Sequence, residues 1–274
     1  MDNTIQLNDE QTKALNYLHS TNDNIFITGN AGTGKSTLLG AFLDSTHKEI
    51  IKLAMTGLAA DNIGGTTIAS FFGFPNDCMN EELLREKSEG FMKAMLDVDA
   101  ILIDEISLVN CFYFQMIDKI LRKYLDSTKP FGGMQMIVVG DFCQLTLEAT
   151  KSIERKILKE HGGVYAFNST AWQKANFQNI SLETVHRQED SELKRILNIL
   201  RDDVDKLTDK DLRILNKRQV STNGLSGIQC SYLCTTRRNV NALNDLHARM
   251  NHGIWPTKEY IASQENFKGK LLNS

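Results

Sequence analysis

One loop limits the folds open to this chain more than any other stretch. Residues 29–37 read GNAGTGKST, and three glycines with one lysine in nine residues cannot fill a hydrophobic core. The loop follows the apolar, strand-like residues 25–28 and precedes a predicted helix over residues 35–43. In that setting its pattern, G-x-x-x-x-G-K-[ST], predicts a cradle whose backbone N–H groups converge on phosphate oxygens. Lys35 would then face the β- and γ-phosphates, and Ser36 would offer its hydroxyl to Mg²⁺.

Strand-like and helical segments alternate along the first two thirds of the chain. Apolar runs predict strands at residues 25–28, 50–54, 100–103 and 136–139, and helical patterns fall at residues 35–43, 81–96 and 112–125. This alternation predicts an α/β fold, in which a parallel sheet is covered by helices on both faces. The strands are continuous apolar runs, as expected for strands that are buried on both faces.

After about residue 187 the pattern changes. One predicted helix carries apolar residues at helical spacing through Leu193, Ile196 and Leu200, and a second helix passes through residues 240–246. Between them, residues 231–234 form a short strand candidate.

Polar residues follow two of the predicted strands. Asp104 and Glu105 end the run AILIDE, where ligands collect in parallel sheets. We expect Asp104 to hold Mg²⁺, through water, and Glu105 to orient or deprotonate an attacking water. Gln144 follows the strand at residues 136–139, and two interpretations stay open for it: a sensor of the γ-phosphate, or an ordinary polar loop residue.

Composition excludes several classes of protein. The 274 residues are 41% hydrophobic with a net charge of −3, so a nucleic acid would have to bind through a local groove. The N-terminus lacks a secretory pattern, and no apolar run approaches the ~20 residues that span a bilayer. The five cysteines are odd in number and scattered, and Cys230 and Cys234 have no partner pair for zinc. We therefore expect free thiols in an intracellular, reducing compartment: the cytoplasm of a bacterium, or the nucleus or mitochondrion of a eukaryote.

Several long segments, in this order, resemble the successive motifs of the PIF/RecD-like DNA helicases of superfamily one. The resemblance covers roughly residues 6 to 250, the N-terminal motor half of such an enzyme. The segments are LNDEQTKAL, GNAGTGKST, TGLAADNIGGTTIASFFGFP, ILIDEISLV, KPFGGMQMIVVGDFCQL and HRQEDSELKRILNILR.

The resemblance implies a RecA-like P-loop NTPase domain over residues 1–185, with a small wedge element inserted at residues 73–97. Residues 186–274 would be an incomplete second RecA-like domain. It also implies ATP-driven movement along single-stranded DNA from 5′ to 3′, with functions in DNA repair, recombination and telomere maintenance. ATP and Mg²⁺ are the implied cofactors.

The family's site residues can be carried over one by one. Gln11 resembles the glutamine that reads the adenine edge, and Gln144 the one that links the γ-phosphate to the DNA surface. Arg187 resembles an arginine that reaches the same phosphate, while Asp104 and Glu105 match the magnesium-binding and water-activating pair. The predicted phosphate cradle comprises Gly29, Asn30, Ala31, Gly32, Thr33, Gly34, Lys35, Ser36 and Thr37.

The predicted DNA surface is residues 56–74, where hydroxyls, glycines and aromatic rings suit a single strand. Phe71 or Phe72 could stack on a base, with the other ring in the core, and we assign the stacking ring to Phe72. The predicted DNA contacts are Thr56, Gly57, Gly65, Thr66, Thr67, Ser70 and Phe72. The implied partner is single-stranded DNA or a junction of single- and double-stranded DNA, bound by a monomer away from any membrane.

The chain departs from the family pattern at three places. Ala69 stands where the family has histidine, and Thr146 and Leu147 stand where it has two prolines. The family also continues beyond Ser274 into the rest of the second domain, with a second arginine worth about 10³ to 10⁵ in rate. We therefore expect this chain to bind nucleotide but hydrolyse it poorly, with the missing motor half as a candidate partner. A truncated form, a shortened gene product and one part of a split helicase all fit.

Two rival hypotheses come from other classes. A nucleotide-dependent DNA-binding module without efficient turnover would share these motifs. An unrelated P-loop enzyme, such as a small-molecule kinase, would bind ATP and ignore DNA.

Overall fold

The chain is described from a computed structural model covering residues 6–74, 86, 88–144, 157–159, 162–185, 190–217, 219 and 231–251. Its internal contacts divide it into a unit of residues 1–208 and a unit of residues 209–274. The predicted domain boundary at residue 185 stays a prediction.

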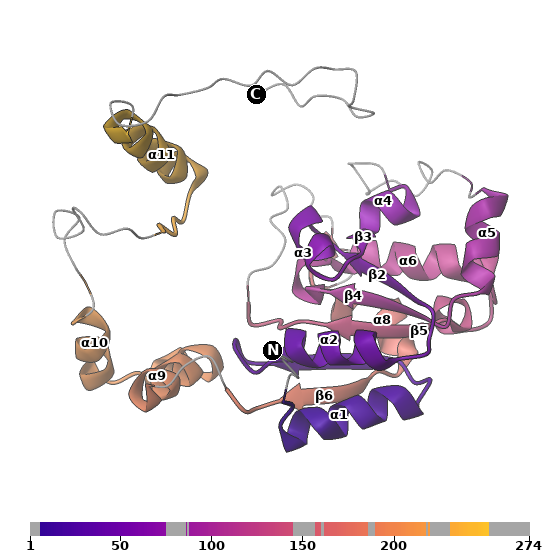
Figure 1. The fold of residues 1–274 in the computed structure, drawn as a ribbon, viewed down its shortest axis with the longest axis horizontal. Coiled ribbons are helices and arrows are strands. Elements are labelled where there is room, and N and C mark those ends of the chain that lie inside the picture. The colour runs from indigo at the N-terminus through magenta and orange to yellow at the C-terminus, as the bar shows by residue number, and fades with distance from the viewer. Residues whose placement is uncertain are drawn as a thin grey trace. The chain divides into compact units, whose positions relative to one another are not determined.

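The first unit is built on a sheet of six strands in the order β3-β2-β4-β5-β1-β6 (Figure 1). Every pairing in it is parallel, so the carboxyl ends of all strands meet at one edge. The predicted parallel α/β sheet is confirmed. The strands are β1 (Ile25–Gly29), β2 (Ile50–Ala54), β3 (Thr66–Thr67), β4 (Ala100–Asp104), β5 (Gln135–Val139) and β6 (Gln178–Leu182).

Alternate side chains of the inner strands enter two separate hydrophobic clusters. Ile25 and Ile27 of β1 belong to one cluster, while Phe26 packs on the other side of the sheet. All five residues of β5 are buried. This explains why the inner strands read as continuous apolar runs.

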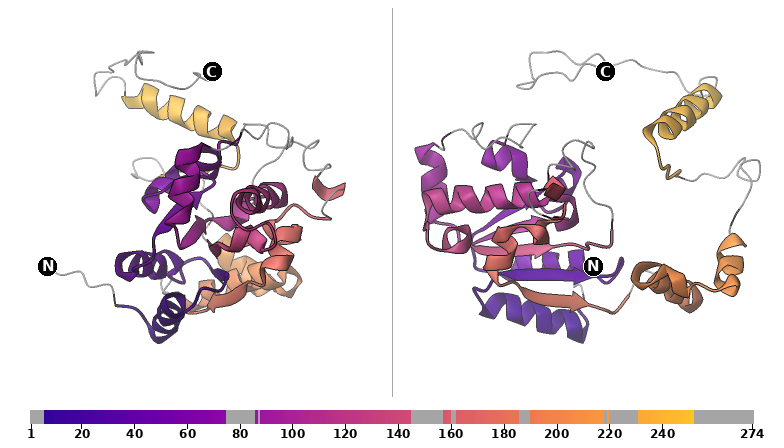
Figure 2. Two further views of the ribbon diagram at one scale, coloured as in Figure 1. Left: turned by 90° about the vertical axis from the view of Figure 1, so that its right-hand side faces the viewer. Right: turned by 180° about the vertical axis from the view of Figure 1, so that it is seen from behind.

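Helices cover both faces of the sheet, as predicted (Figures 1 and 2). Helices α1 (Asp9–Ser20) and α2 (Lys35–Ser45) close the cluster that contains Ile25. The opposite cluster is closed by α4 (Ile68–Phe72), α6 (Cys111–Tyr124) and α8 (Thr170–Ala175). α6 buries residues at helical spacing along one side, which is why its periodicity was legible in the sequence.

Short helices connect the strands near the carboxyl edge. Thr56 caps α3 (Gly57–Asn62) by accepting from the Ala59 N–H at 3.3 Å, and Thr67 caps α4 by accepting from Ser70 at 3.2 Å. The 3₁₀ turns of the described residues are η2 (Ile106–Leu108), η3 (Pro130–Gly133), η4 (Ala166–Asn168) and η5 (Val204–Lys206).

Helix α5 (Glu89–Leu96) is shorter than the helix predicted over residues 81–96. The Ser88 hydroxyl accepts the N–H of Phe91 at 3.2 Å, and this cap sets the start of α5 at Glu89. Residues 75–85 and 87 of the predicted wedge lie outside the described residues.

The helix predicted around Ile196 is confirmed as α9 (Ser191–Asp202). In the second unit, α10 spans Asp209–Asn216, and α11 (Arg237–Asn251) confirms the helix predicted through residues 240–246. The strand predicted at residues 231–234 is wrong: these residues are irregular. A strand needs a hydrogen-bonded neighbour, and the described residues of this unit contain no other strand.

Among the residues that the structure describes, no helix has the length and apolar character needed to cross a membrane.

Candidate functional site

The loop of residues 30–34 leaves β1 at its carboxyl end and enters α2 at Lys35. Gly29 has a φ of +151°, and a Cβ there would collide with the Leu182 carbonyl of β6. Only glycine therefore allows the loop to start this close to the neighbouring strand. Thr33 is buried, and its hydroxyl donates to the Asn30 carbonyl at 2.9 Å, which holds the turn.

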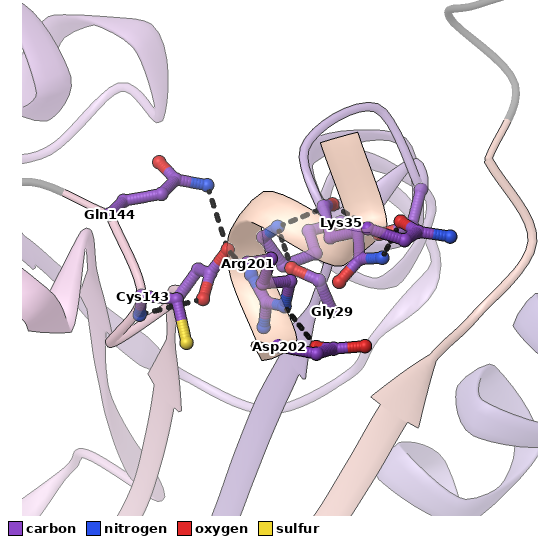
Figure 3. Close-up of polar contacts among 10 residues, drawn as sticks. Gly29, Lys35, Cys143, Gln144, Arg201 and Asp202 are labelled. Carbon is purple, nitrogen blue, oxygen red and sulfur yellow. Dashed lines mark hydrogen bonds and ion pairs between the residues drawn. The ribbon is translucent and has the colours of Figure 1, made fainter. Parts of the chain in front are cut away.

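Lys35 folds back onto its own loop. Its ammonium group donates to the carbonyl oxygens of Gly29 at 2.8 Å and Asn30 at 3.1 Å (Figure 3). Burial lowers the pKa of Lys35, and the negative charges of Asp141 and Glu105 act in the opposite direction. The ammonium group is thus held by neutral carbonyl oxygens, and the two carboxylates lie close enough to act on its pKa.

The two predicted carboxylates lie at the end of β4. Asp104 is the last residue of that strand, and one of its oxygens accepts the Glu105 N–H at 2.9 Å. Burial raises the pKa of Asp104; burial and the charge of Asp104 raise the pKa of Glu105. Glu105 has a left-handed backbone, with φ 52° and ψ 49°, at a cost of about 1–2 kcal/mol. Such strain collects at functional sites.

These groups meet in one pocket of about 460 Å³ at the carboxyl edge of the sheet. It brings together the loop, both carboxylates and Gln144, which lie far apart in the sequence. Its lining residues are Ala31, Gly32, Gly34, Lys35, Ser36, Thr37, Asp104, Glu105, Gly140 and Gln144. A hollow of about 680 Å³ beside α1 and β6 is larger but includes none of the predicted site residues.

Gln11 lies beside the loop, with its side chain committed to other contacts. Its amide donates to the Gly34 carbonyl at 3.3 Å, and its oxygen accepts the Asn8 N–H at 3.1 Å as part of a capping box. The predicted reading of adenine by Gln11 stays a prediction. Arg187, the predicted second contact to the γ-phosphate, lies outside the described residues, as do Thr146 and Leu147.

Asp141 and Arg201 form an ion pair to which the sequence analysis gave no role. Asp141 is only 1% exposed, and its carboxylate accepts from Arg201, from the Gln144 amide at 3.1 Å and from the Cys143 N–H at 3.0 Å (Figure 3). Burial alone would raise the pKa of Asp141, but the hydrogen bond from Arg201 and the other donors lower it overall. Asp141 lies in the motif GDFCQL and Arg201 in LNILR, so both residues belong to segments that resemble the family. The sequence alone does not show that these two segments meet.

A second groove, of about 890 Å³, adjoins the first pocket. Glu105 and Gln144 line both hollows and therefore stand between them. The groove also includes Thr56, Leu58, Ala59, Asn62, Ser107, Leu108, Cys143 and Tyr165. Of the predicted DNA contacts, only Thr56 is among its lining residues.

The other predicted DNA contacts are spread over the connections around β3. Gly57 and Ser70 are exposed, and Thr66 and Thr67 are partly buried in β3. A Cβ on Gly65 would collide with the Lys52 carbonyl of β2, so this glycine has a packing role whether or not DNA binds.

Phe72 corrects one expectation. Its ring is fully buried in the core, with centroids 4.9 Å from the Phe71 ring and 5.5 Å from the Phe74 ring. It therefore cannot offer a face to a base in this structure. Phe71 is only partly buried, which makes it the ring of the pair with exposed surface.

The chain is similar to known proteins in sequence and in fold. A family model described as PIF1-like helicase matches residues 6–209. The ATP-dependent DNA helicase PIF1 of Danio rerio is 34% identical over 261 residues, or 94% of this chain and 39% of that protein. The crystal structure of Bacteroides Pif1 bound to single-stranded DNA has a TM-score of 0.75 at 32% identity, covering 88% of this chain and 56% of that one. The Bacteroides Pif1 complex with ADP-AlF4 gives a TM-score of 0.76 with the same coverage.

Proposed function

Because the chain belongs to the PIF1-like helicase family, we propose that it is a motor portion of an ATP-dependent DNA helicase that moves 5′ to 3′ on single-stranded DNA. The chain spans 39% of the Danio rerio relative and 56% of the solved Bacteroides chain. One observation carries the proposal: the loop, Asp104, Glu105 and Gln144 line a single pocket at the carboxyl edge of a parallel sheet.

The pocket suits a nucleoside triphosphate. Lys35 is held only by carbonyl oxygens in the bonds described, and these can be exchanged for the more favourable anionic oxygens of the β- and γ-phosphates. The backbone N–H groups of residues 29–37 would complete the cradle. Gln11, beside Gly34, would then read the adenine edge after giving up one of its present contacts.

The pocket also fits Mg²⁺, since the Ser36 hydroxyl and the Asp104 carboxylate are the hard oxygen ligands that this ion prefers. Burial raises the pKa of Asp104, and a divalent cation bound to its carboxylate would favour the ionised form. When bound, the ion would neutralise charge on the phosphate oxygens.

Glu105 is the residue we assign to proton transfer. It would accept the proton of a water whose oxygen bonds to the γ-phosphorus while the bond to the departing ADP breaks. Its raised pKa makes it a stronger base than an ordinary glutamate. Gln144 and Arg187 would contact the γ-phosphate during this step.

The second groove is the part of the surface that we assign to DNA. It shares Glu105 and Gln144 with the nucleotide pocket, so a strand in the groove would adjoin the residues that handle the γ-phosphate. Thr56 would contact the strand, with Gly57, Gly65, Thr66, Thr67 and Ser70 further along it, and Phe71 replaces Phe72 as the stacking ring. Single-stranded DNA or its junction with duplex is the proposed partner, bound by a monomer in an intracellular, reducing compartment.

A steady-state ATPase assay with and without single-stranded DNA tests the proposal. We expect turnover that rises when a single strand is added and disappears in Lys35→Ala, with the exposed Lys174→Ala as the control for loss of a lysine. DNA binding that depends on nucleotide but without turnover would instead indicate a binding module. ATP turnover that ignores DNA would support a small-molecule kinase and contradict the proposal.

A further inference from the structure

The carboxylate of Asp141 joins two parts of the first unit. One oxygen, Oδ2, accepts from Arg201 near the end of α9 and also from the Gln144 amide, 3.1 Å away (Figure 3). The other oxygen accepts the Cys143 N–H at 3.0 Å. Two donors with different attachments thus share a single acceptor atom, in a side chain that is 1% exposed.

Helix α9 makes a second contact near the same place. The Asn30 amide of the phosphate loop donates to Asn198 of α9 at 2.9 Å. Between the loop, Asp141 and α9 lies a cavity of about 280 Å³, whose lining includes Asn30, Gln144, Asn198 and Arg201. The loop, Gln144 and α9 therefore face one another across a small space.

We propose that Asp141 is a positioning residue that couples Gln144 to α9, so that α9 is held more firmly when a γ-phosphate engages Gln144. This inference rests on the proposed function, because it takes Gln144 to be the residue that contacts the γ-phosphate. It adds a route by which the nucleotide state reaches α9, which ends shortly before the second unit begins at Asp209.

The shared oxygen predicts which nucleotide holds α9 more firmly. When the Gln144 amide turns to a γ-phosphate it leaves Oδ2, and the buried carboxylate then depends more on Arg201. When only ADP is bound, Gln144 returns to Oδ2 as a second donor, which draws on the same negative charge and weakens the bond from Arg201. Docking of α9 should therefore be firmer with a triphosphate than with a diphosphate.

Amide hydrogen exchange of the full chain, with ATPγS-Mg²⁺ and with ADP-Mg²⁺, tests this coupling. In the parent we expect exchange in α9 to be about 10-fold slower with ATPγS, the scale of one hydrogen bond to a charged group. Gln144→Ala should give slow exchange with both nucleotides, and Arg201→Met fast exchange with both. Arg213→Met, which removes the same charge from an exposed arginine of α10, should behave as the parent. Exchange in α6 reports whether each variant is folded.

The outcomes separate the coupling from the function on which it rests. If both nucleotides slow the amide exchange of residues 29–37 but α9 exchanges at the same rate with each of them, the inference is overturned and the proposed function stands. A parent-like difference in Arg201→Met would overturn it as well. If Arg201→Met fails to fold, the Gln144→Ala arm decides, since retention of the parent's difference there contradicts the coupling. If neither nucleotide protects residues 29–37, the proposed function fails and the inference fails with it.

Discussion

Glu105 combines a left-handed backbone with a carboxylate whose pKa is raised by burial and by Asp104. We expect Glu105→Gln to retain the affinity for ATPγS-Mg²⁺ within about 2-fold. Hydrolysis should slow by about 10² to 10⁴, because the variant keeps the shape of the side chain and loses its proton acceptor. Single-turnover hydrolysis alongside equilibrium titration separates the two quantities. Hydrolysis at the parent rate would remove Glu105 from the proposed mechanism.

The neighbouring rings Phe71 and Phe72 differ in burial and serve as controls for each other. We expect Phe72→Ala to lower the free energy of unfolding by about 3–5 kcal/mol, because it empties a fully packed site in the core. Phe71→Ala should cost less stability but weaken the binding of single-stranded DNA by about 1–3 kcal/mol, the contribution of one stacked base. Urea denaturation and fluorescence anisotropy with a labelled oligonucleotide measure the two effects. A loss of DNA affinity from a well-folded Phe72→Ala alone would reverse this assignment.

At the residue scale, motifs in the sequence predicted which side chains come together. Lys35, Ser36, Asp104 and Glu105 were predicted from local patterns and Gln144 from the family resemblance, and all five line one pocket. Their chemical roles stay predictions. The pair of Asp141 and Arg201 could not be predicted, because no local pattern in the sequence links two residues that are 60 positions apart. The choice of Phe72 over Phe71 as the stacking ring was wrong, because which of two adjacent phenylalanines is buried depends on how α4 turns toward the core.

At the scale of elements, the buried strands were predicted because they are continuous apolar runs. The strand β6 reads QNISL and lies at the edge of the sheet, where polar side chains are tolerated, so its sequence carried no comparable signal. The start of α5 was misplaced because the charged residues before Ser88 are compatible with a helix, and only the cap decides where it begins.

The ion pair between Arg201 of α9 and Asp141, in the turn that follows β5, predicts that the stability of the protein depends on pH in the acid range. The pKa of Asp141 is lowered in the folded protein, so its contribution to stability is present above its ordinary value of 3.8 and is lost as the pH falls through the lower folded value. We expect Arg201→Met to be less stable than the parent by about 1.5–3 kcal/mol at pH ~7, because a buried carboxylate loses its charged donor. Below pH ~4 the gap should narrow as Asp141 becomes protonated.

Urea denaturation at several pH values measures this gap. Arg213→Met, at an exposed position, is the control for the loss of an arginine and should have the parent's stability at every pH. A difference between the parent and Arg201→Met that stays constant from neutral to acid pH would show that the pair does not contribute through the charge of Asp141.

At the scale of the whole molecule, the net charge of −3 means that the proposed DNA partner would have to be held by a local surface. We expect the logarithm of the affinity for single-stranded DNA to fall linearly with the logarithm of the salt concentration. The slope should be about −0.7 per neutralised phosphate, because each contact releases a condensed counterion. Anisotropy titrations between ~50 and ~200 mM salt measure the slope, and a flat response would contradict phosphate contact in the proposed groove.

The sequence predicted the parallel sheet and the family over most of the chain, because strand alternation and ordered motifs are properties of long segments. The extent of the first compact unit was harder to predict. It includes α9, which is tied to the sheet and the phosphate loop by Arg201 and Asn198. Such ties between distant segments set the limits of a unit and leave no local mark in the sequence.

The central claim is that a triphosphate binds at the loop of residues 29–37. Isothermal titration of the full chain with ATPγS-Mg²⁺ tests it most directly, with Lys35→Ala as the test variant and Lys174→Ala as the control. We predict one site per chain in the parent and in Lys174→Ala, and an affinity at least ~10-fold weaker in Lys35→Ala, because the variant loses a charged donor to the phosphates. Equal affinity in all three proteins, or no binding in the parent, would contradict the account.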